Sequence, residues 1–378
     1  MLYFRACILL LIFAKKAQCT DTETGENATS RDVFKGKTFM HRTKPIPSEK
    51  KDSVLERMKK RRQEAALKKD GTVQIGKRII RGRFAKKGEF PYQVAVIADV
   101  DEICGGSLIS LRHVLTAAHC VYGKHKFDLI LGSLDQETAD EGSTTISSTK
   151  AEYHNLYNNE TLANDIAIIY LPNAVRETDY IKRITLPTRQ QSSKVGQPGT
   201  TATIAGWGRT SDGKMKISYS QYHIRETKCF SASMDVSQKL KTANLNILPK
   251  SECDDAYGEE NILSSNVCAF GDNGDSTCQG DSGGPLVEKV GNERVQIGLV
   301  SFGAGEGCEK SYPEVYTRVS SYISWIKQRS EVSSSSIANK SPPKNKRKQK
   351  HVNKKQNKKA KQKIIKPKKL IIGNNAFF

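Results

Sequence analysis

No stretch of the 378-residue sequence is long and apolar enough to cross a bilayer as a helix. One short apolar run, Cys7 to Ala14, follows Arg5 and precedes small and polar residues, which is the pattern of a secretory signal peptide. We therefore expect residues 1–19 to be a signal peptide and the protein to be secreted. The pair Lys15-Lys16 beside the expected cleavage position leaves the exact site open.

Acidic residues are almost absent from the C-terminal end. Residues 329–378 carry 16 basic side chains and one acidic one, and the tract from Lys340 to Lys369 has no acidic residue. Side chains of like charge at this density repel one another, so we expect the tail to be disordered and solvated. Residues 20–78 have a net charge of +7, whereas residues 79–328 have a net charge of −4. The net charge of +21 therefore belongs to the extensions and not to the middle of the chain.

Aromatic residues are scarce in residues 20–78, which are polar and dense in charge. Such a segment has little apolar surface for a core of its own, so we expect it to be disordered or partly helical in isolation. A helix is compatible with Ser48 to Asp70, although its apolar stripe is thin. The apolar residues of that stripe are Val54, Leu55, Met58 and Leu67.

From Ile79 the sequence changes to short β-branched and apolar runs separated by clusters of Gly, Asn, Asp and Ser. Many short strands at close spacing predict an all-β domain, either a sandwich or a barrel. A last stretch, Ser321 to Gln328, has helical periodicity and is expected to pack Tyr322, Ile323 and Ile326 inward. The predicted strands include Gln93 to Ile97, Ser107 to Ser110, His113 to Ala117, Asp128 to Leu131, Ile166 to Leu171, Thr201 to Ala205, Val295 to Phe302 and Val315 to Val319.

A single serine stands within a glycine-rich stretch, Gly280 to Pro285 (GDSGGP). Flanking glycines allow a tight, exposed turn in which the Ser282 hydroxyl and the neighbouring N–H groups face one bound carbonyl. Such a cluster on its own is equally compatible with an ordinary surface turn. The choice between the two interpretations depends on what the rest of the chain supplies.

Two other stretches supply partners for this serine. His119 ends an apolar strand in LTAAHC, and Asp165 enters an apolar strand in NDIAI. Each residue alone has an ordinary explanation, because a histidine is often a surface residue and an acid before a strand is usually solvated. In the order His, Asp, Ser and within these flanking residues, the three stretches resemble the chymotrypsin-like (trypsin-fold) serine peptidases. The resemblance covers residues 79–328 and is closest in look to arthropod chymotrypsin-like and brachyurin enzymes.

The resemblance implies two antiparallel six-stranded β-barrels with a C-terminal helix and an active site between the barrels. It implies that Ser282 attacks the scissile carbonyl and that His119 takes and returns the proton. Buried Asp165 would orient the imidazole and stabilise its charged form. The N–H groups of Gly280 and Ser282 would form the oxyanion hole. No cofactor is expected.

A match at Lys77 to Gly82 implies activation by cleavage after Arg78, by a trypsin-like protease. The released ammonium of Ile79 would then pair with the buried carboxylate of Asp281 and order the oxyanion hole and the pocket. Residues 20–78 are then the pro-region of a zymogen. Arg81 stands where the family usually has glycine.

The resemblance also implies three disulfides: Cys104 with Cys120, Cys253 with Cys268, and Cys278 with Cys308. Cys19 and Cys229 could form a disulfide with each other, form intermolecular disulfides or stay free, and the sequence leaves these three states open. Cys229 lies in Tyr219 to Met234, part of a segment that is longer than the family usually has.

The residues expected to form the specificity pocket are Ser276, Ser301, Gly303 and Glu314. Ser276 stands where trypsins carry aspartate, which favours a chymotrypsin-like preference for Phe, Tyr and Leu. Glu314 replaces a common glycine on the pocket wall, and its carboxylate could either receive a lysine or arginine side chain or narrow the pocket. The segment Ser301-Phe302-Gly303 matches the edge that pairs with the substrate backbone.

A second class of function is polyanion binding through Lys340 to Lys369, with the peptidase fold as a platform. Lysine tracts bind heparin-like sugars or anionic surfaces through charge. Protein or peptide substrates are the partners of the first interpretation, and we expect a monomer. No metal constellation stands out, although the acidic loop Asp135 to Glu141 is compatible with a calcium site as well as with a solvated loop.

Overall fold

The computed structural model describes residues 18–19, 42–68, 82–99, 102–136, 140–212, 216–219, 229–233, 237–272, 274–310 and 312–338. The chain divides into two units, residues 1–333 and 334–378, and the fold described below belongs to the first. The expected activation residues Arg78, Ile79 and Arg81 and the lysine tract lie outside the described residues. No helix in the described part is long and apolar enough to span a membrane.

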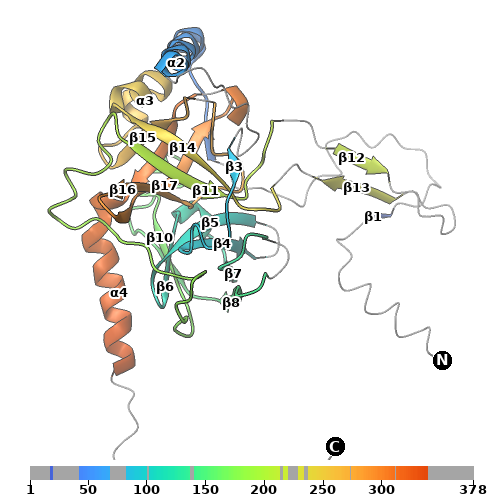
Figure 1. Cartoon of the computed structure of the whole chain (residues 1–378), viewed down its shortest axis with the longest axis vertical. Helices are drawn as coiled ribbons and strands as arrows, with labels where there is room; N and C mark the ends of the chain where they lie inside the picture. The colour runs from blue at the N-terminus through green and yellow to red at the C-terminus, as the bar shows by residue number, and fades with distance from the viewer. Residues whose placement is uncertain are drawn as a thin grey trace, which may run out of the picture. The chain divides into compact units, whose positions relative to one another are not determined.

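The N-terminal half of residues 82–328 forms an antiparallel sheet in the order β8-β7-β4-β5-β6-β10-β9 (Figure 1). Its core is a cluster of buried aliphatic side chains that includes Val96, Leu108 and Leu129. In the described residues the two edge strands of this sheet are not paired with each other, so it is a half-barrel. Its strands are β4 (Gln93–Ala98), β5 (Glu102–Ser110), β6 (His113–Thr116), β7 (Phe127–Leu131), β8 (Thr144–Ser148), β9 (Ala151–Tyr153) and β10 (Ala167–Tyr170).

The second half forms a sheet in the order β11-β16-β17-β18-β15-β14-β3, and β11 also pairs with β14. This extra pairing closes six strands into a barrel, so the all-β prediction with two barrels is confirmed, with one barrel closed and one open. The strands are β3 (Arg83–Phe84), β11 (Thr201–Gly206), β14 (Lys241–Leu248), β15 (Asn266–Phe270), β16 (Pro285–Val290), β17 (Glu293–Ala304) and β18 (Glu314–Arg318).

The long segment before β14 adds a small separate sheet in the order β1-β13-β12, formed by Gln18–Cys19, Cys229–Ser233 and Lys216–Tyr219. Its backbone register sets Cys19 directly opposite Cys229.

The C-terminal helix α4 (Ile323–Ala338) begins within the predicted stretch but continues well past its predicted end at Gln328. Tyr322 and Ile326 are buried as expected, together with Trp325. Other helices are α3 (Lys250–Tyr257) and the 3-10 helices Ala118–Cys120, Glu259–Asn261, Cys308–Lys310 and Val319–Tyr322.

The expected pro-region contributes a short strand, β2 (Arg42–Lys44), and a helix, α2 (Ser48–Lys68). Strand β2 pairs with β17, and α2 contacts α3 (Figure 1). Val54 and Met58 are each 1% exposed, so these two residues of the thin apolar stripe are buried against the rest of the chain. The helical interpretation of this segment is thereby confirmed for residues 48–68.

Candidate active site

Ser282 lies in a turn that requires glycine on both sides. The φ angles of Gly280 and Gly283 are +98° and +76°, in the left-handed region that disfavours a side chain. A Cβ atom at Gly283 would lie 2.2 Å from Thr116 Oγ1, and Gly105 N donates a hydrogen bond to Ser282 O at 2.7 Å. These close approaches hold the serine turn of the closed barrel against strands β5 and β6 of the other sheet.

His119 and Asp165 are both fully buried and are paired with each other. Asp165 Oδ2 accepts a hydrogen bond from His119 Nδ1 at 2.8 Å, and Oδ1 accepts one from His119 N at 3.0 Å. The histidine follows β6 and the aspartate precedes β10, and these strands are antiparallel neighbours with Thr116 opposite Ala167. The sheet therefore brings together two residues that are far apart in the sequence.

Asp165 has a further hydrogen-bond donor in Ser301. Ser301 Oγ donates to Asp165 Oδ2 at 2.7 Å and has no solvent exposure. Thr317 Oγ1 donates to the main-chain oxygen of Asp165 at 2.8 Å. Three donors on one carboxylate leave it a single orientation, which in turn fixes the plane of the His119 ring. The sequence assigned Ser301 to the pocket and substrate edge only, because 136 positions separate it from Asp165 and no local pattern links them.

The side chains expected to be catalytic are closed to solvent. His119 Nε2 is buried, and among the described residues it has no hydrogen-bond partner. Ser282 also has no exposure. A general base must lie within hydrogen-bond reach of the hydroxyl that it deprotonates. The hydrogen bond between Nε2 and the serine hydroxyl is therefore not formed in this state of the chain.

Asp281 is 3% exposed, and burial raises the pKa of its carboxyl to about 6. Gly208 N donates to Oδ1 at 2.7 Å, and Cys278 N donates to Oδ2 at 3.0 Å. A Cβ atom would lie 2.0 Å from Oδ1 at Gly206 and 2.4 Å from Oδ2 at Gly208. Both glycines are therefore needed to make room for this carboxylate. Its expected partner, Ile79, lies outside the described residues.

Glu314 and Ser276 meet at the base of the expected pocket. Ser276 Oγ donates to Glu314 Oε1, which also accepts a hydrogen bond from Thr277 N at 2.5 Å. Tyr316 OH donates to Glu314 Oε2. Burial raises the pKa of the Glu314 carboxyl to about 7 despite these donors. Near neutral pH both the charged and the neutral forms of the group are therefore expected to be populated.

The cavity between these residues is small. Its volume is about 10 Å³, roughly the space for one water molecule, and its lining includes Gly303, Ala304 and Tyr312. Of the two structural roles considered for Glu314, the narrowing of the pocket is the one seen in this state. Glu314 of the pocket wall and Asp281, the expected partner of Ile79, are bound by consecutive main-chain N–H groups. Thr277 N donates to Glu314, and Cys278 N donates to Asp281.

Two groups of side chains in the described residues have the composition of a metal site, one around His119 and one around Asp212. In each group the two cysteines form a disulfide, so neither group offers a thiolate. Asp140 of the acidic loop accepts hydrogen bonds from Leu134 N at 2.7 Å and from Lys87 Nζ at 3.1 Å. The Asp140 carboxylate of the loop considered as a calcium site is therefore bound by protein donors.

Comparison with known proteins places this geometry in one family. The family model described as Trypsin matches residues 79–239 and 231–326. The chain belongs to the trypsin family. It is similar to brachyurin of Leptuca pugilator (36% identity, covering 66% of this chain and 96% of the relative) and to trypsin I-P1 of Gallus gallus (38%, 66% and 88%). A solved structure titled HL collagenase is 31% identical, with a TM-score of 0.57, and the match covers 67% of this chain and 99% of that one.

The chain is thus a serine endopeptidase of the trypsin family, and the predicted resemblance is confirmed. The two matched pieces meet at residues 231–239, inside the segment that the sequence predicted to be longer than in the family. The predicted disulfides are present as Cys104–Cys120, Cys253–Cys268 and Cys278–Cys308. The first two of these bridges brace the histidine loop and helix α3, and the third braces the pocket.

The hydrogen bond from the Ser301 hydroxyl to Asp165 can be tested by substitution. Replacing the hydroxyl in Ser301→Ala removes one donor from a buried carboxylate, a loss of about 1.5–3 kcal/mol in comparable hydrogen bonds. We expect kcat of the activated enzyme to fall by at least about tenfold while KM stays near its original value, because the hydroxyl acts through Asp165 and His119.

Thr317→Val is the matched control, since Thr317 donates to the main-chain oxygen of Asp165 and not to its carboxylate. Equal losses of kcat in the two variants, measured on short peptide esters or amides, would show that Ser301 has only a packing role.

Proposed function

We propose that this protein is a secreted serine endopeptidase that is made as a zymogen and hydrolyses peptide bonds with a triad of Ser282, His119 and Asp165. The observation that carries the proposal is the buried His119–Asp165 pair, held by Ser301, beside a serine in a glycine turn. The proposed boundaries are a signal peptide at 1–19, a pro-region at 20–78, a peptidase domain at 79–328 and a basic tail at 329–378.

In the proposed mechanism Ser282 Oγ attacks the scissile carbonyl while His119 Nε2 takes its proton. The negative charge on the tetrahedral oxygen is stabilised by the N–H groups of Gly280 and Ser282, an effect worth roughly 3 kcal/mol per donor in studied enzymes. His119 then returns the proton to the leaving amine. Asp165 keeps the Nδ1 proton of His119 in place, so that Nε2 is free to act as the base.

In the proposed activation step, cleavage after Arg78 by a trypsin-like protease frees the amino group of Ile79. Asp281 is the acceptor, because its buried carboxyl has a pKa raised to about 6 and a cation beside it would stabilise the charged form. The pairing would convert a carboxyl that is costly to ionise into a charged, fixed group. Since Cys278 N is bound to this carboxylate and Thr277 N to Glu314, the same step can rearrange the pocket wall.

We propose a chymotrypsin-like preference for aromatic residues and Leu, with Lys and Arg accepted as Glu314 becomes charged. Ser276 offers no charge at the base, and its hydroxyl is already bound to Glu314. The narrow cavity has to open before any large side chain can enter. The neutral form of Glu314 suits an apolar side chain, and the ionised form suits a cation.

The central test is controlled cleavage after Arg78. We expect the purified zymogen to have little activity, and the cleaved chain, once its pro-region has been removed, to hydrolyse peptide substrates. Ser282→Ala should be cleaved equally well and should lose at least about 10⁴-fold in kcat. Amino-terminal sequencing of the active form should begin at Ile79. A different first residue, or retained activity in Ser282→Ala, would contradict the proposal.

We expect the preference between Lys and Phe substrates to depend on pH through Glu314. Its pKa of about 7 means that the charged fraction rises from roughly a tenth at pH 6 to roughly nine tenths at pH 8. We expect the ratio of kcat/KM for Lys over Phe substrates to rise up to about tenfold across that range. Taking the ratio cancels the titration of the triad, which both substrates share.

Glu314→Gln keeps the size of the side chain but cannot ionise, and its ratio should stay flat over the same pH range. If wild type and Glu314→Gln cleave Lys substrates equally at every pH, Glu314 has no part in recognising a cation.

We propose separately that the tail, through Lys340 to Lys369, binds heparin-like sugars or anionic surfaces and so tethers the protease. Its support is composition alone, since the tract lies outside the described residues. We expect the full chain to elute from heparin at higher salt than a chain ending at Ala338, where helix α4 ends. Elution of both chains at the same salt concentration would contradict the tether. A full chain that binds heparin but stays inactive after correct cleavage would favour the platform function.

A further inference from the structure

The edge of strand β17 that the sequence assigns to the substrate backbone is already paired. Strand β2 of the pro-region runs parallel to it, with Arg42 opposite Phe302, Thr43 opposite Gly303 and Lys44 opposite Ala304. The pairing is extended by a hydrogen bond from Gly305 N to Lys44 O at 3.1 Å. A sheet edge accepts only one additional strand, so β2 and a substrate cannot occupy it together.

The direction of β2 is the opposite of the direction that catalysis requires. Ser301 is bound to Asp165, and β17 leads away from the catalytic residues as it continues to Ala304. A substrate must present the carboxyl end of its acyl segment to Ser282, so its chain has to run antiparallel to β17. Strand β2 runs parallel, with its amino end nearest the catalytic residues. It therefore occupies the edge without offering a peptide bond in a productive orientation.

Apolar side chains anchor the segment beside this edge. Ile46, Val54 and Met58 are 2%, 1% and 1% exposed and belong to one buried cluster with Phe302 and Tyr312. Burying three side chains of this size removes a large apolar area from water, which stabilises the docked segment. The cluster also includes Ala304 of the edge and Tyr257 of helix α3. The pro-region thus covers the apolar lining of the substrate side of the closed barrel.

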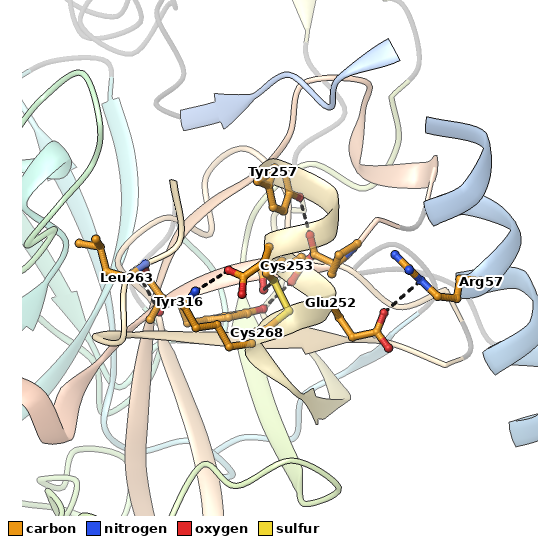
Figure 2. The surroundings of a disulfide bond; sticks show 12 residues. Arg57, Glu252, Cys253, Tyr257, Leu263, Cys268 and Tyr316 are labelled. Carbon is orange, nitrogen blue, oxygen red and sulfur yellow. Dashed lines mark hydrogen bonds and ion pairs between the residues drawn. A yellow bond between two sulfur atoms is a disulfide. The ribbon is translucent and has the colours of Figure 1, made fainter. Parts of the chain in front are cut away.

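Charge complementarity aligns the two helices. Figure 2 shows Arg57 of α2 facing Glu252 of α3, next to the Cys253–Cys268 bridge. Arg57 Nε lies 3.3 Å from Glu252 Oε2, and Arg57 Nη1 lies 2.9 Å from Asp255 Oδ2. Arg61 also pairs with Glu252, at the next turn of the helix. Basic α2 is therefore matched to an acidic face of α3.

Other contacts fix the two ends of β2. At its start, Arg42 Nη2 donates to Asn159 Oδ1 at 2.5 Å, in the loop that leads to Asp165. After its end, Ile46 N donates to Glu306 Oε1 at 3.3 Å. Lys51 Nζ lies 3.0 Å from the same carboxylate oxygen. The segment around strand β2 is thus held to a loop of each sheet.

We propose that residues 42–68 are a built-in inhibitor that stays docked on the substrate edge after the chain is cleaved at Arg78. Cleavage there breaks the link to the peptidase domain but none of the contacts described above. The lack of exposure of Ser282 and His119 is the state expected of an inhibited site. This inference rests on the proposed activation at Arg78 and adds a second step, release of the pro-region, before full activity.

The test uses the full chain with Cys19→Ser, so that no disulfide from Cys19 can hold the pro-fragment. Residues 74–78 are replaced by the recognition sequence of a protease of unrelated specificity, so that a single cut leaves Ile79 first. Initial rates on a short peptide substrate are measured immediately after the cut and again after the pro-fragment has been separated by gel filtration. For the wild type we expect the first rate to be at least about tenfold lower than the second, with the fragment co-eluting with the domain before separation.

Val54→Asp places a charge in the buried cluster and should raise the first rate at least about tenfold over wild type, close to its own second rate. Ser53→Asp is the matched control, because it adds the same charge at the adjacent exposed position and should behave as wild type. Arg57→Glu, at a side chain that is 38% exposed, is a second variant whose folding is not in question. It repels both Glu252 and Asp255 and should release the fragment in the same way.

Equal first and second rates in the wild type, with the fragment eluting separately, would overturn the inhibitor. The inhibitor would also be overturned if the fragment co-elutes with the domain but the first rate equals the second. Absence of activity in the separated domains of wild type and variants alike would instead overturn the proposed function, and the inhibitory role would fall with it. Gel filtration still reports docking in that case, so the two failures are distinguishable.

Discussion

The cost of burying a carboxylate governs the centre of this molecule. Three acidic side chains, Asp165, Asp281 and Glu314, are almost completely buried within the peptidase fold, and each could ionise there only with donors around it. Asp165 has an imidazole, a main-chain N–H and the Ser301 hydroxyl. Asp281 has two main-chain N–H groups, and Glu314 has two hydroxyls and one N–H. The differences between these donor sets give the three acids different tasks.

Asp281 and Glu314 both have raised pKa values, to about 6 and about 7, because main-chain and hydroxyl donors do not fully replace water. A cation beside either group would recover much of the cost. For Asp281 the proposed cation is part of the chain itself, and for Glu314 it is part of the substrate. Thr277 N and Cys278 N are adjacent along the chain and bind one acid each, so the two carboxylates are bound to successive main-chain N–H groups.

The sequence predicted those parts of the site that lie in short local patterns. The glycines around Ser282, the strand ending at His119 and the aspartate before β10 are each visible within a few residues, and their positions in one family gave the fold. The hydroxyl contact of Ser301 with Asp165 and the contact of Ser276 with Glu314 join residues that no local period connects. The apolar stripe of α2 was visible as well. Its docking partner was not, because Val54 and Met58 pack against β17, β18 and α3, about two hundred or more residues later.

Strand β17 contacts both the proposed catalytic residues and the proposed inhibitory segment. Ser301 near its end donates a hydrogen bond to Asp165 of the proposed triad, and the edge of the strand pairs with β2. While the chain is intact, β2 is tethered and its effective concentration at the edge is high, so modest contacts suffice to hold it. After cleavage at Arg78 the same contacts have to hold a separate fragment against dilution. Docking would then persist where the zymogen is concentrated and be lost where it is dispersed, so that cutting and dilution together, and neither alone, would expose Ser282.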